Sequence, residues 1–358
     1  MRVLVAWADD RSPNLGVRAL AHGSAALVRQ ALGDCEVDFQ NFGRGAAPVP
    51  LGSLRSLVRE NVDRRAVRDW IAGYDLVVDT RSGDSFADIY GTRRLATMTL
   101  LAETARRVGV PVVLGPQTIG PFESGRGRAL ARRSLRTARV VMARDGASAD
   151  ASARLGRPVD LLTTDVVFAL PVPQVPTTRD VVLNVSGLLW HDGPHVDSSA
   201  YRAAVDEVCR GLLESGRRVT LLAHVLDSPR TDNDVPAVEA VAAAHPDVDV
   251  VVPADLDEVR RVVASARLVI GSRMHACLNA LSVGVPAVPM AYSRKFAPLL
   301  DALGWSRTVD LRSSTTAGED VLKIAGDPSL ADDAADVRHR AQELLAPAAD
   351  LLRATVGP

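Results

Sequence analysis

Short apolar runs rich in β-branched residues alternate with stretches of helical pattern along almost the whole chain. In the first half, such runs predict strands at residues 3–7, 75–79, 111–114 and 138–143. Alanine-, leucine- and arginine-rich segments predict helices at residues 19–32, 65–72, 90–108 and 126–135. This alternation predicts a parallel sheet covered by helices on both faces. The nearly continuous apolar character of the strands agrees, because strands in such a sheet are buried on both sides.

The periodicity stops at Pro171-Val172-Pro173-Gln174-Val175-Pro176, where three prolines in six residues favour an extended connection. Beyond it, strands are predicted at residues 180–185, 218–222, 248–252, 268–270 and 287–289, and helices at 201–214, 235–244, 256–264, 274–283 and 297–303. We therefore expect an N-terminal Rossmann-like domain over 1–173, a second over 178–325, and a C-terminal helix within 328–358 that can pack back on the first. Two α/β domains facing a cleft would bind ligands at the carboxyl ends of their strands.

Composition excludes several classes of protein. The chain of 358 residues is long enough for two domains with separate cores. Its 42 basic and 43 acidic side chains give a formal net charge of −1, which offers no argument for nucleic acid or an anionic membrane, although a local anion site stays possible. Three widely spaced cysteines indicate reduced thiols. The start MRVLVAWADD reads as a buried strand, and no apolar run reaches membrane-spanning length, so we expect a cytoplasmic protein.

Common nucleotide and metal signatures are missing from the sequence. It contains no GxxxxGK[ST] and no HExxH, and the glycine pairs at 43/45 and 125/127 lack both a third glycine and a preceding strand. The acid pairs at 247/249 and 255/257 flank a short strand and the next helix, where turn and capping roles explain them. We therefore predict no metal site and no resident cofactor.

The segment Gly271-Ser272-Arg273-Met274-His275-Ala276 joins a predicted strand to a predicted helix. Ser272 is the predicted N-cap, where free N–H groups and the helix dipole attract an anion. A cation works against the dipole there, so Arg273 needs an anionic partner, and its planar fork suits carboxylate or phosphate. His275 can exchange a proton near neutral pH. The alternative is a capped helix with a core histidine. Cys277 does not face His275 at this spacing, which excludes a Cys–His dyad.

Polar clusters follow other predicted strands as well. The candidate side chains are Lys295, Tyr292, Arg144, Asp84, Ser85, Gln117 and Thr118. Loop 81–91 is polar and suits a hydroxyl-rich ligand, and loop 115–122 offers an amide and a hydroxyl for sugar hydroxyls. Solvated or capping loops would explain each cluster alone. All of them nevertheless stand at the carboxyl end of a predicted strand, which capping does not require.

Several of these segments resemble the polysaccharide pyruvyl transferases. The matching segments are GDSFADIYG (83–91), GPQTIGPF (115–122), ARD (143–145), AHV (223–225), GSRMHA (271–276) and YSRK (292–295), in the expected order. The resemblance implies a GT-B-like fold, phosphoenolpyruvate as donor on the second domain and a saccharide acceptor on the first. It implies that Arg144, Arg273, His275 and Lys295 form the donor-binding and catalytic set, with Ser272 and Tyr292 nearby.

Two segments depart from the family pattern. The family usually begins with N-x-G-D before its first helix, whereas this chain has Asn14-Leu15-Gly16-Val17. Many members carry glycines where Thr80-Arg81-Ser82 stands. Both departures lie in the domain expected to face the acceptor, where Asn14 is a further candidate for substrate binding.

The reaction that the resemblance implies places two sugar hydroxyls on C2 of the enolpyruvyl group and expels phosphate. We expect His275 to protonate the methylene carbon, the three cations to hold the donor's negative charges, and Asp84 to deprotonate a hydroxyl or hold the acceptor. Two alternatives stay open: a GT-B glycosyltransferase that uses a sugar nucleotide, and a carbohydrate-binding member without activity. A peripheral membrane contact would suit a lipid-linked acceptor.

Overall fold

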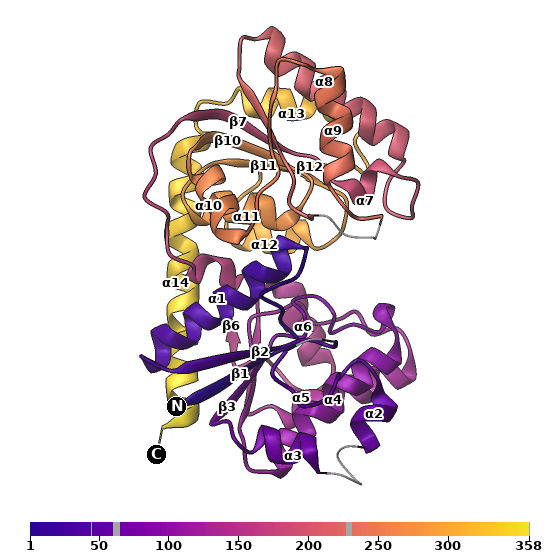
Figure 1. The fold of residues 1–358 in the computed structure, drawn as a ribbon, viewed down its shortest axis with the longest axis vertical. Coiled ribbons are helices and arrows are strands. Elements are labelled where there is room, and N and C mark those ends of the chain that lie inside the picture. The colour runs from indigo at the N-terminus through magenta and orange to yellow at the C-terminus, as the bar shows by residue number, and fades with distance from the viewer. Residues whose placement is uncertain (44, 60–64, 227–230, 358) are drawn as a thin grey trace. The chain divides into compact units, whose positions relative to one another are not determined.

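The computed structural model describes residues 1–43, 45–59, 65–226 and 231–357, and Figure 1 shows its ribbon. The chain divides into two compact units. Unit 1 comprises Met1–Arg11, Leu20–Leu170 and Gln342–Pro358, and unit 2 comprises Ser12–Ala19 and Pro171–Ala341. The predicted proline-rich connection at 171–176 thus lies at the start of the longer part of unit 2.

Unit 1 is built on a parallel sheet with the strand order β2-β1-β3-β4-β5-β6. Its strands are β1 (Arg2–Ala6), β2 (Glu36–Gln40), β3 (Leu76–Asp79), β4 (Val112–Leu114), β5 (Val140–Ala143) and β6 (Leu161–Leu162). The strands β3, β4 and β5 are buried along their whole length, as expected for parallel strands between two layers of helices.

The helices of unit 1 cover both faces of this sheet. They are α1 (Leu15–Leu32), α2 (Leu54–Arg59), α3 (Ala66–Ile71), η2 (Asp88–Tyr90), α4 (Thr92–Arg107), α5 (Gly125–Thr137), α6 (Gly146–Arg154), η3 (Val166–Ala169) and the end of α14 (Leu330–Val356). Leu95 of α4 and Leu135 of α5 belong to the core on one face. On the other face, Leu27 of α1 and Leu352 of α14 lie around Val78 of β3.

Unit 2 repeats the plan with the strand order β12-β11-β10-β7-β8-β9. The strands are β7 (Arg179–Asn184), β8 (Val219–Leu222), β9 (Asp249–Val251), β10 (Ala266–Gly271), β11 (Ala287–Ala291) and β12 (Val309–Asp310). The helices are α7 (Gly187–Trp190), α8 (Ser198–Glu214), α9 (Val235–Ala244), α10 (Leu256–Ala264), α11 (Met274–Ser282), α12 (Phe296–Ala302) and α13 (Ala317–Ala325). The strands β10, β7 and β8 lie side by side in the middle of the sheet.

The predicted α/β architecture with two parallel sheets is confirmed. The strands β2, β6 and β12 and the helices α2, α7 and α13 were not predicted. The strand β2 is an edge strand that is only half-buried, so the apolar run that marks a central strand is missing from its sequence EVDFQ. The end of α14 contacts unit 1, where Arg353 donates a hydrogen bond to the carbonyl oxygen of Ala31 and Thr163 donates one to that of Leu344.

Candidate functional site

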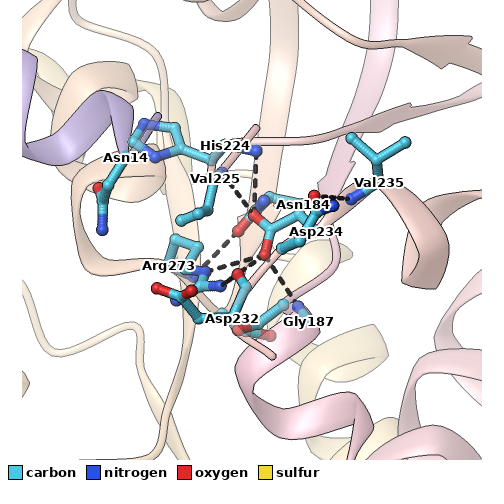
Figure 2. A network of polar contacts seen from close by, with 12 residues as sticks. Asn14, Asn184, Gly187, His224, Val225, Asp232, Asp234, Val235 and Arg273 are labelled. Carbon is cyan, nitrogen blue, oxygen red and sulfur yellow. Dashed lines mark hydrogen bonds and ion pairs between the residues drawn. The ribbon is translucent and has the colours of Figure 1, made fainter. Parts of the chain in front are cut away.

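The three central strands of unit 2 place polar groups at one edge of its sheet. The strand β7 ends at Asn184, β8 is followed by His224, and β10 is followed by Arg273. Because these strands are parallel neighbours, their carboxyl ends meet, which is where ligands bind in open α/β sheets. The Arg273 N–H donates to Oδ1 of Asn184 at 2.9 Å, so the ends of β10 and β7 are joined directly (Figure 2).

A buried carboxylate, Asp234, lies at the centre of this edge (Figure 2). Its Oδ2 accepts hydrogen bonds from the N–H groups of His224 and Val225 at 3.0 and 2.9 Å. Its Oδ1 accepts from the Gly187 N–H at 2.8 Å and from Nε and Nη2 of Arg273 at 3.1 and 2.6 Å. Asp234 is absent from the predicted site residues, because it follows no strand and its place before α9 suggests only a cap. Its side chain makes no capping bond there.

The anionic partner that Arg273 requires is therefore part of the protein. Arg273 is 7% exposed. Its guanidinium pairs with Asp234 and also donates to the carbonyl oxygen of Asp232. Because Asp234 compensates the charge of Arg273 at the helix start, no bound ligand is needed to offset the helix dipole there. Its role in binding a donor stays a prediction.

The predicted N-cap at Ser272 is wrong. The helix α11 begins at Met274 and its N-cap residue is Arg273, without a capping side chain. Ser272 is buried, and its hydroxyl accepts a hydrogen bond at 2.8 Å from the hydroxyl of Tyr201 on α8. Arg273 has an extended backbone, with φ −89° and ψ 122°, so the helix begins later than predicted and Ser272 lies in the interior of unit 2. We therefore assign Ser272 to holding the end of β10 and not to contact with a substrate.

The segment Ser12–Ala19 belongs to unit 2, which corrects its assignment to the first domain. The Leu15 N–H donates to the carbonyl oxygen of His224 at 3.1 Å, and the Leu226 N–H donates to that of Pro13 at 2.8 Å. The Asn14 side chain accepts from the Gly16 N–H at 2.9 Å and so shapes the turn into α1. These backbone bonds hold the segment against the chain that follows β8.

The same segment packs against His275 in the first turn of α11. A Cβ atom added to Gly16 would lie 2.9 Å from Nδ1 of His275 and 3.1 Å from the Asn14 side-chain oxygen. A side chain at position 16 would therefore displace the imidazole or the asparagine. Behind His275, the side chain of Asn279 donates to the His275 carbonyl oxygen at 2.7 Å. The position of His275 thus depends on a segment near the start of the sequence and on its own helix.

Two neighbours of His275 are unsuited to proton transfer near neutral pH. Burial lowers the pKa of His224 to about 3, with the charges of His275 and Arg273 as further causes, so His224 is neutral. Burial raises the pKa of the Cys277 thiol, which contacts the carbonyl oxygen of Gly271 at 3.4 Å. Cys277 therefore forms no reactive dyad with His275, in agreement with the prediction from its spacing.

A second group of unit 2 follows β11. Tyr292 comes directly after this strand, and Lys295 directly precedes α12. The ring of His195 lies edge-on to the Tyr292 ring, with their centroids 5.4 Å apart. The pKa of His195 is lowered by burial first, and then by the positive charges of Lys295 and Arg273. This group therefore lies in a positive electrostatic field.

The sequence pointed to Lys295 but not to His195. His195 was not predicted, because the loop that carries it follows α7 and no strand ends there. Lys295 had a signal beyond its motif: only 2 of the 42 basic side chains are lysines, the other being Lys323.

In unit 1, the loops after β4 and β5 bring Gln117, Thr118 and Arg144 together. Arg144 is buried, pairs with Asp165 at 2.7 Å and donates to the Thr118 hydroxyl at 3.0 Å. The Gln117 side chain is fully buried, and neither its oxygen nor its nitrogen has a hydrogen-bond partner among the described residues. An unsatisfied buried amide is costly and needs an explanation, which water or a ligand hydroxyl would supply.

Asp84 and Ser85 lie in the loop after β3. The Asp84 carboxylate accepts from the Tyr90 hydroxyl at 2.9 Å, and the Ser85 hydroxyl is 3.5 Å from it. The carbonyl oxygen of Gly83 accepts from the Thr118 N–H at 2.9 Å, which joins this loop to the one after β4. The structure therefore brings the predicted residues of unit 1 to one edge of its sheet.

Arg81, at one of the two departures from the family pattern, lies in the interior of unit 1. Its side chain is fully buried, pairs with Asp79 at 3.1 Å, donates to the Ser134 hydroxyl of α5 and stacks on Phe86. Arg81 and Ser82 have φ values of 49° and 53°, in the left-handed region that glycine adopts most easily. The backbone thus retains a conformation suited to glycine, while the arginine side chain is accommodated in the interior.

The described residues contain no group of three or more His, Cys, Asp or Glu side chains arranged to hold a metal ion. Asp255 caps α10 by accepting from the Glu258 N–H at 2.8 Å, as predicted for this acid. In the same described ranges, no helix has the length and apolar character needed to span a membrane.

Comparison with known proteins identifies relatives of this sequence. A family model described as polysaccharide pyruvyl transferase matches residues 14–294. The amylovoran biosynthesis protein AmsJ of Erwinia amylovora is 22% identical over 280 residues, which cover 72% of this chain and 66% of that protein. The chain therefore spans just under two thirds of the length of this relative.

Solved structures with similar folds include sugar-nucleotide enzymes. The putative UDP-N-acetylglucosamine 2-epimerase of Listeria monocytogenes aligns with a TM-score of 0.63 and 13% identity over 99% of this chain and 97% of its own. HepE of Anabaena, solved with UDP and glucose, aligns with a TM-score of 0.60 and 15% identity over 99% of both chains. At such identities the similarity establishes the fold alone, a GT-B arrangement of two parallel-sheet α/β domains.

Proposed function

Since the chain belongs to the polysaccharide pyruvyl transferase family, we propose that it transfers the enolpyruvyl group of phosphoenolpyruvate to a saccharide. The product is a pyruvate ketal on two hydroxyls, and phosphate is released. The observation that carries the proposal is the convergence of Asn14, Gly16, Arg273 and His275 on one sheet edge of unit 2. All four residues lie within the region that the family model matches.

The chemistry requires a proton donor and a site for anions. Two C–O bonds form at C2 of the enolpyruvyl group, and the bond from C2 to the phosphate oxygen breaks. The two acceptor hydroxyls lose two protons, of which one ends on the methylene carbon and one on phosphate. Because C2 gains positive character when the methylene is protonated, a general acid near neutral pH accelerates the step.

His275 is the proposed general acid, and unit 2 is the proposed donor side. The backbone at Gly16 restricts the imidazole, which favours a defined orientation toward a bound donor. Lys295 and Tyr292 would bind the donor's carboxylate or phosphate together with His195. The lowered pKa of His195 supports this assignment, since the same field that disfavours its proton favours an anion. Arg273, oriented by Asp234, adds to that field.

Unit 1 is the proposed acceptor side. The buried amide of Gln117 and the carboxylate of Asp84 are suited to sugar hydroxyls, which both donate and accept hydrogen bonds. We assign Arg144 a positioning role, because its Nη1 and Nε atoms donate hydrogen bonds to Asp165 and to the Thr118 hydroxyl. The scheme uses phosphoenolpyruvate as a co-substrate and no further cofactor, and we place the reaction in the cytoplasm.

The decisive measurement is phosphate release from phosphoenolpyruvate across a panel of saccharide acceptors, with the product linkage identified by NMR. We expect acceptor-dependent release and a ketal carbon attached to two sugar oxygens. Transfer or hydrolysis of a sugar nucleotide without any use of phosphoenolpyruvate would instead establish a glycosyltransferase. Saccharide binding without turnover across the panel would establish a binding protein. Either of these results would overturn the proposal.

A further inference from the structure

Arginines dominate the outer surface of the adjacent helices α4 and α5 in unit 1. The segment 125–139 carries six arginines and neither Asp nor Glu. An open groove of about 650 Å³ is lined by Arg106, Arg107, Arg132, Arg133, Arg136, Glu103, Ala129 and Thr137. The carboxylate of Glu103 is already paired with Arg133 and Arg107. The groove therefore has a large excess of positive charge, although the whole chain has a formal charge of −1.

The stability of the two helices accounts for only part of this charge. Arg106 and Arg136 lie in the last turns of their helices, where a cation complements the helix dipole. Arg126 and Arg128 lie in the first turn of α5, where a cation opposes it. Within the described ranges, Arg106, Arg132 and Arg136 are exposed and form no ion pair. Their charges are thus available to an external anion.

The lining of the groove recognises charge and little else. It contains no aromatic side chain on which a base or a sugar ring could stack. Its one hydroxyl, on Thr137, already donates to the carbonyl oxygen of Arg133. A partner that binds here is therefore selected by its density of negative charge, and an extended anionic surface satisfies two parallel helices better than a single small ligand does.

Exposed apolar side chains lie in η2, beside the start of α5. Asp88 accepts hydrogen bonds from the N–H and hydroxyl of Ser124, so η2 lies against the start of α5. In η2, Ile89 is 55% exposed and Tyr90 is 41% exposed. Aliphatic and aromatic side chains beside basic ones are the composition of surfaces that lie in the interface of a bilayer. They favour a membrane over a purely polar polyanion.

We propose that the α4–α5 face docks unit 1 on an anionic phospholipid surface. The contact is peripheral and electrostatic, with Ile89 and Tyr90 at its edge. It concerns where the protein binds in the cell and does not depend on the function proposed above. A basic residue close to an anionic leaflet typically raises the partition coefficient about fivefold. Three such residues therefore account for a factor of about 100.

The test is co-sedimentation with phosphatidylcholine vesicles that contain or lack about 30 mol% phosphatidylglycerol, at low salt and at about 0.5 M NaCl. The test variant is Arg106→Gln/Arg132→Gln/Arg136→Gln, which leaves the arginines paired with Glu103 in place. The matched control is Arg154→Gln/Arg210→Gln/Arg261→Gln, which removes the same charge from exposed positions on α6, α8 and α10. Thermal unfolding of each variant checks its fold.

We expect the wild-type protein and the control to bind the anionic vesicles at low salt, and to bind neither neutral vesicles nor any vesicles at high salt. The test variant should bind about 100-fold more weakly. Equal binding by the two triple variants, or no binding by the wild-type protein, would refute the proposal. So would tighter binding to a soluble acidic polysaccharide than to the vesicles at the same salt, because the surface would then be a site for a polymer.

Discussion

Replacing Asp234 by asparagine tests whether one buried carboxylate holds the functional edge of unit 2 together. Its Oδ1 accepts hydrogen bonds from the Gly187 N–H and from two nitrogens of Arg273, and its Oδ2 accepts from two backbone N–H groups. Asparagine offers one oxygen and one NH₂ group. Whichever way the amide turns, its NH₂ group faces hydrogen-bond donors. The change also leaves the buried guanidinium of Arg273 without its counter-charge.

The expected loss follows from breaking a buried ion pair. Removing one partner of such a pair typically costs about 3–5 kcal/mol, because the remaining charge stays buried and uncompensated. The backbone N–H groups that lose their acceptor contribute to the same loss of unfolding free energy, so we do not add a separate amount for them. We therefore expect Asp234→Asn to lower the free energy of unfolding by about 3–5 kcal/mol, against a total of about 5–15 kcal/mol for a typical domain.

The assay is urea unfolding followed by circular dichroism, with separate transitions fitted if the two units unfold independently. Asp232→Asn is the matched control, since Arg273 hydrogen-bonds only the backbone carbonyl of Asp232 and the Asp232 charge raises the pKa of Arg273 less than Asp234 does. The double variant Asp234→Asn/Arg273→Gln should lose less stability than the sum of its single variants, because the second change removes the stranded charge. A loss below about 1 kcal/mol for Asp234→Asn, or one equal to that of the control, would refute the reasoning.

Three further predictions concern the residues around His275. The variant His275→Ala should lower turnover by about 10²–10⁴ while phosphoenolpyruvate still binds, and unchanged phosphate release would remove His275 from the mechanism. Gly16→Ala should displace the His275 imidazole and lower turnover by about 10², whereas Gly146→Ala, whose added Cβ meets nothing within 4 Å, should leave phosphate release unchanged. The lowered pKa of His224 means that below about pH 6.5 the unfolded chain binds a proton that the folded chain does not. Stability should therefore fall by up to about 1.4 kcal/mol per pH unit from pH 6.5 towards pH 5, and His224→Gln should flatten this dependence in denaturant titrations.

The sequence predicted the main elements of the fold because they are encoded locally. The strands β3, β7 and β10 each contain three consecutive apolar residues, and alanine-, leucine- and arginine-rich segments mark most of the helices between strands. The half-buried edge strand β2 has no such pattern, since only its position in the sheet makes it a strand. The positions of Arg273, Lys295 and Arg144 between a strand and the next helix were equally visible, because the connection from strand to helix is local.

Other features depended on how distant segments meet. The φ values of Arg81 and Ser82 are left-handed although neither residue is glycine, and the burial of the arginine follows from the presence of Asp79 and Ser134 around it. The attachment of Ser12–Ala19 to unit 2 rests on backbone hydrogen bonds to the chain after β8. Such bonds can form with almost any side chain, so the sequence does not reveal them. His195 was not predicted because its loop follows a helix, and its place beside Tyr292 depends on the tertiary structure.

By itself, the sequence determined that this protein has two parallel α/β sheets and that its polar candidates stand at the carboxyl ends of their strands. It also determined that Arg273 requires an anion, since a cation at a helix start opposes the dipole. Only the tertiary structure decided that the anion is Asp234, which is 39 residues away in the chain. The physical reason is that periodicity encodes local conformation and the buried face, whereas the pairing of two charges depends on strand order. The segment after β8 meets the end of β10 because both strands flank β7.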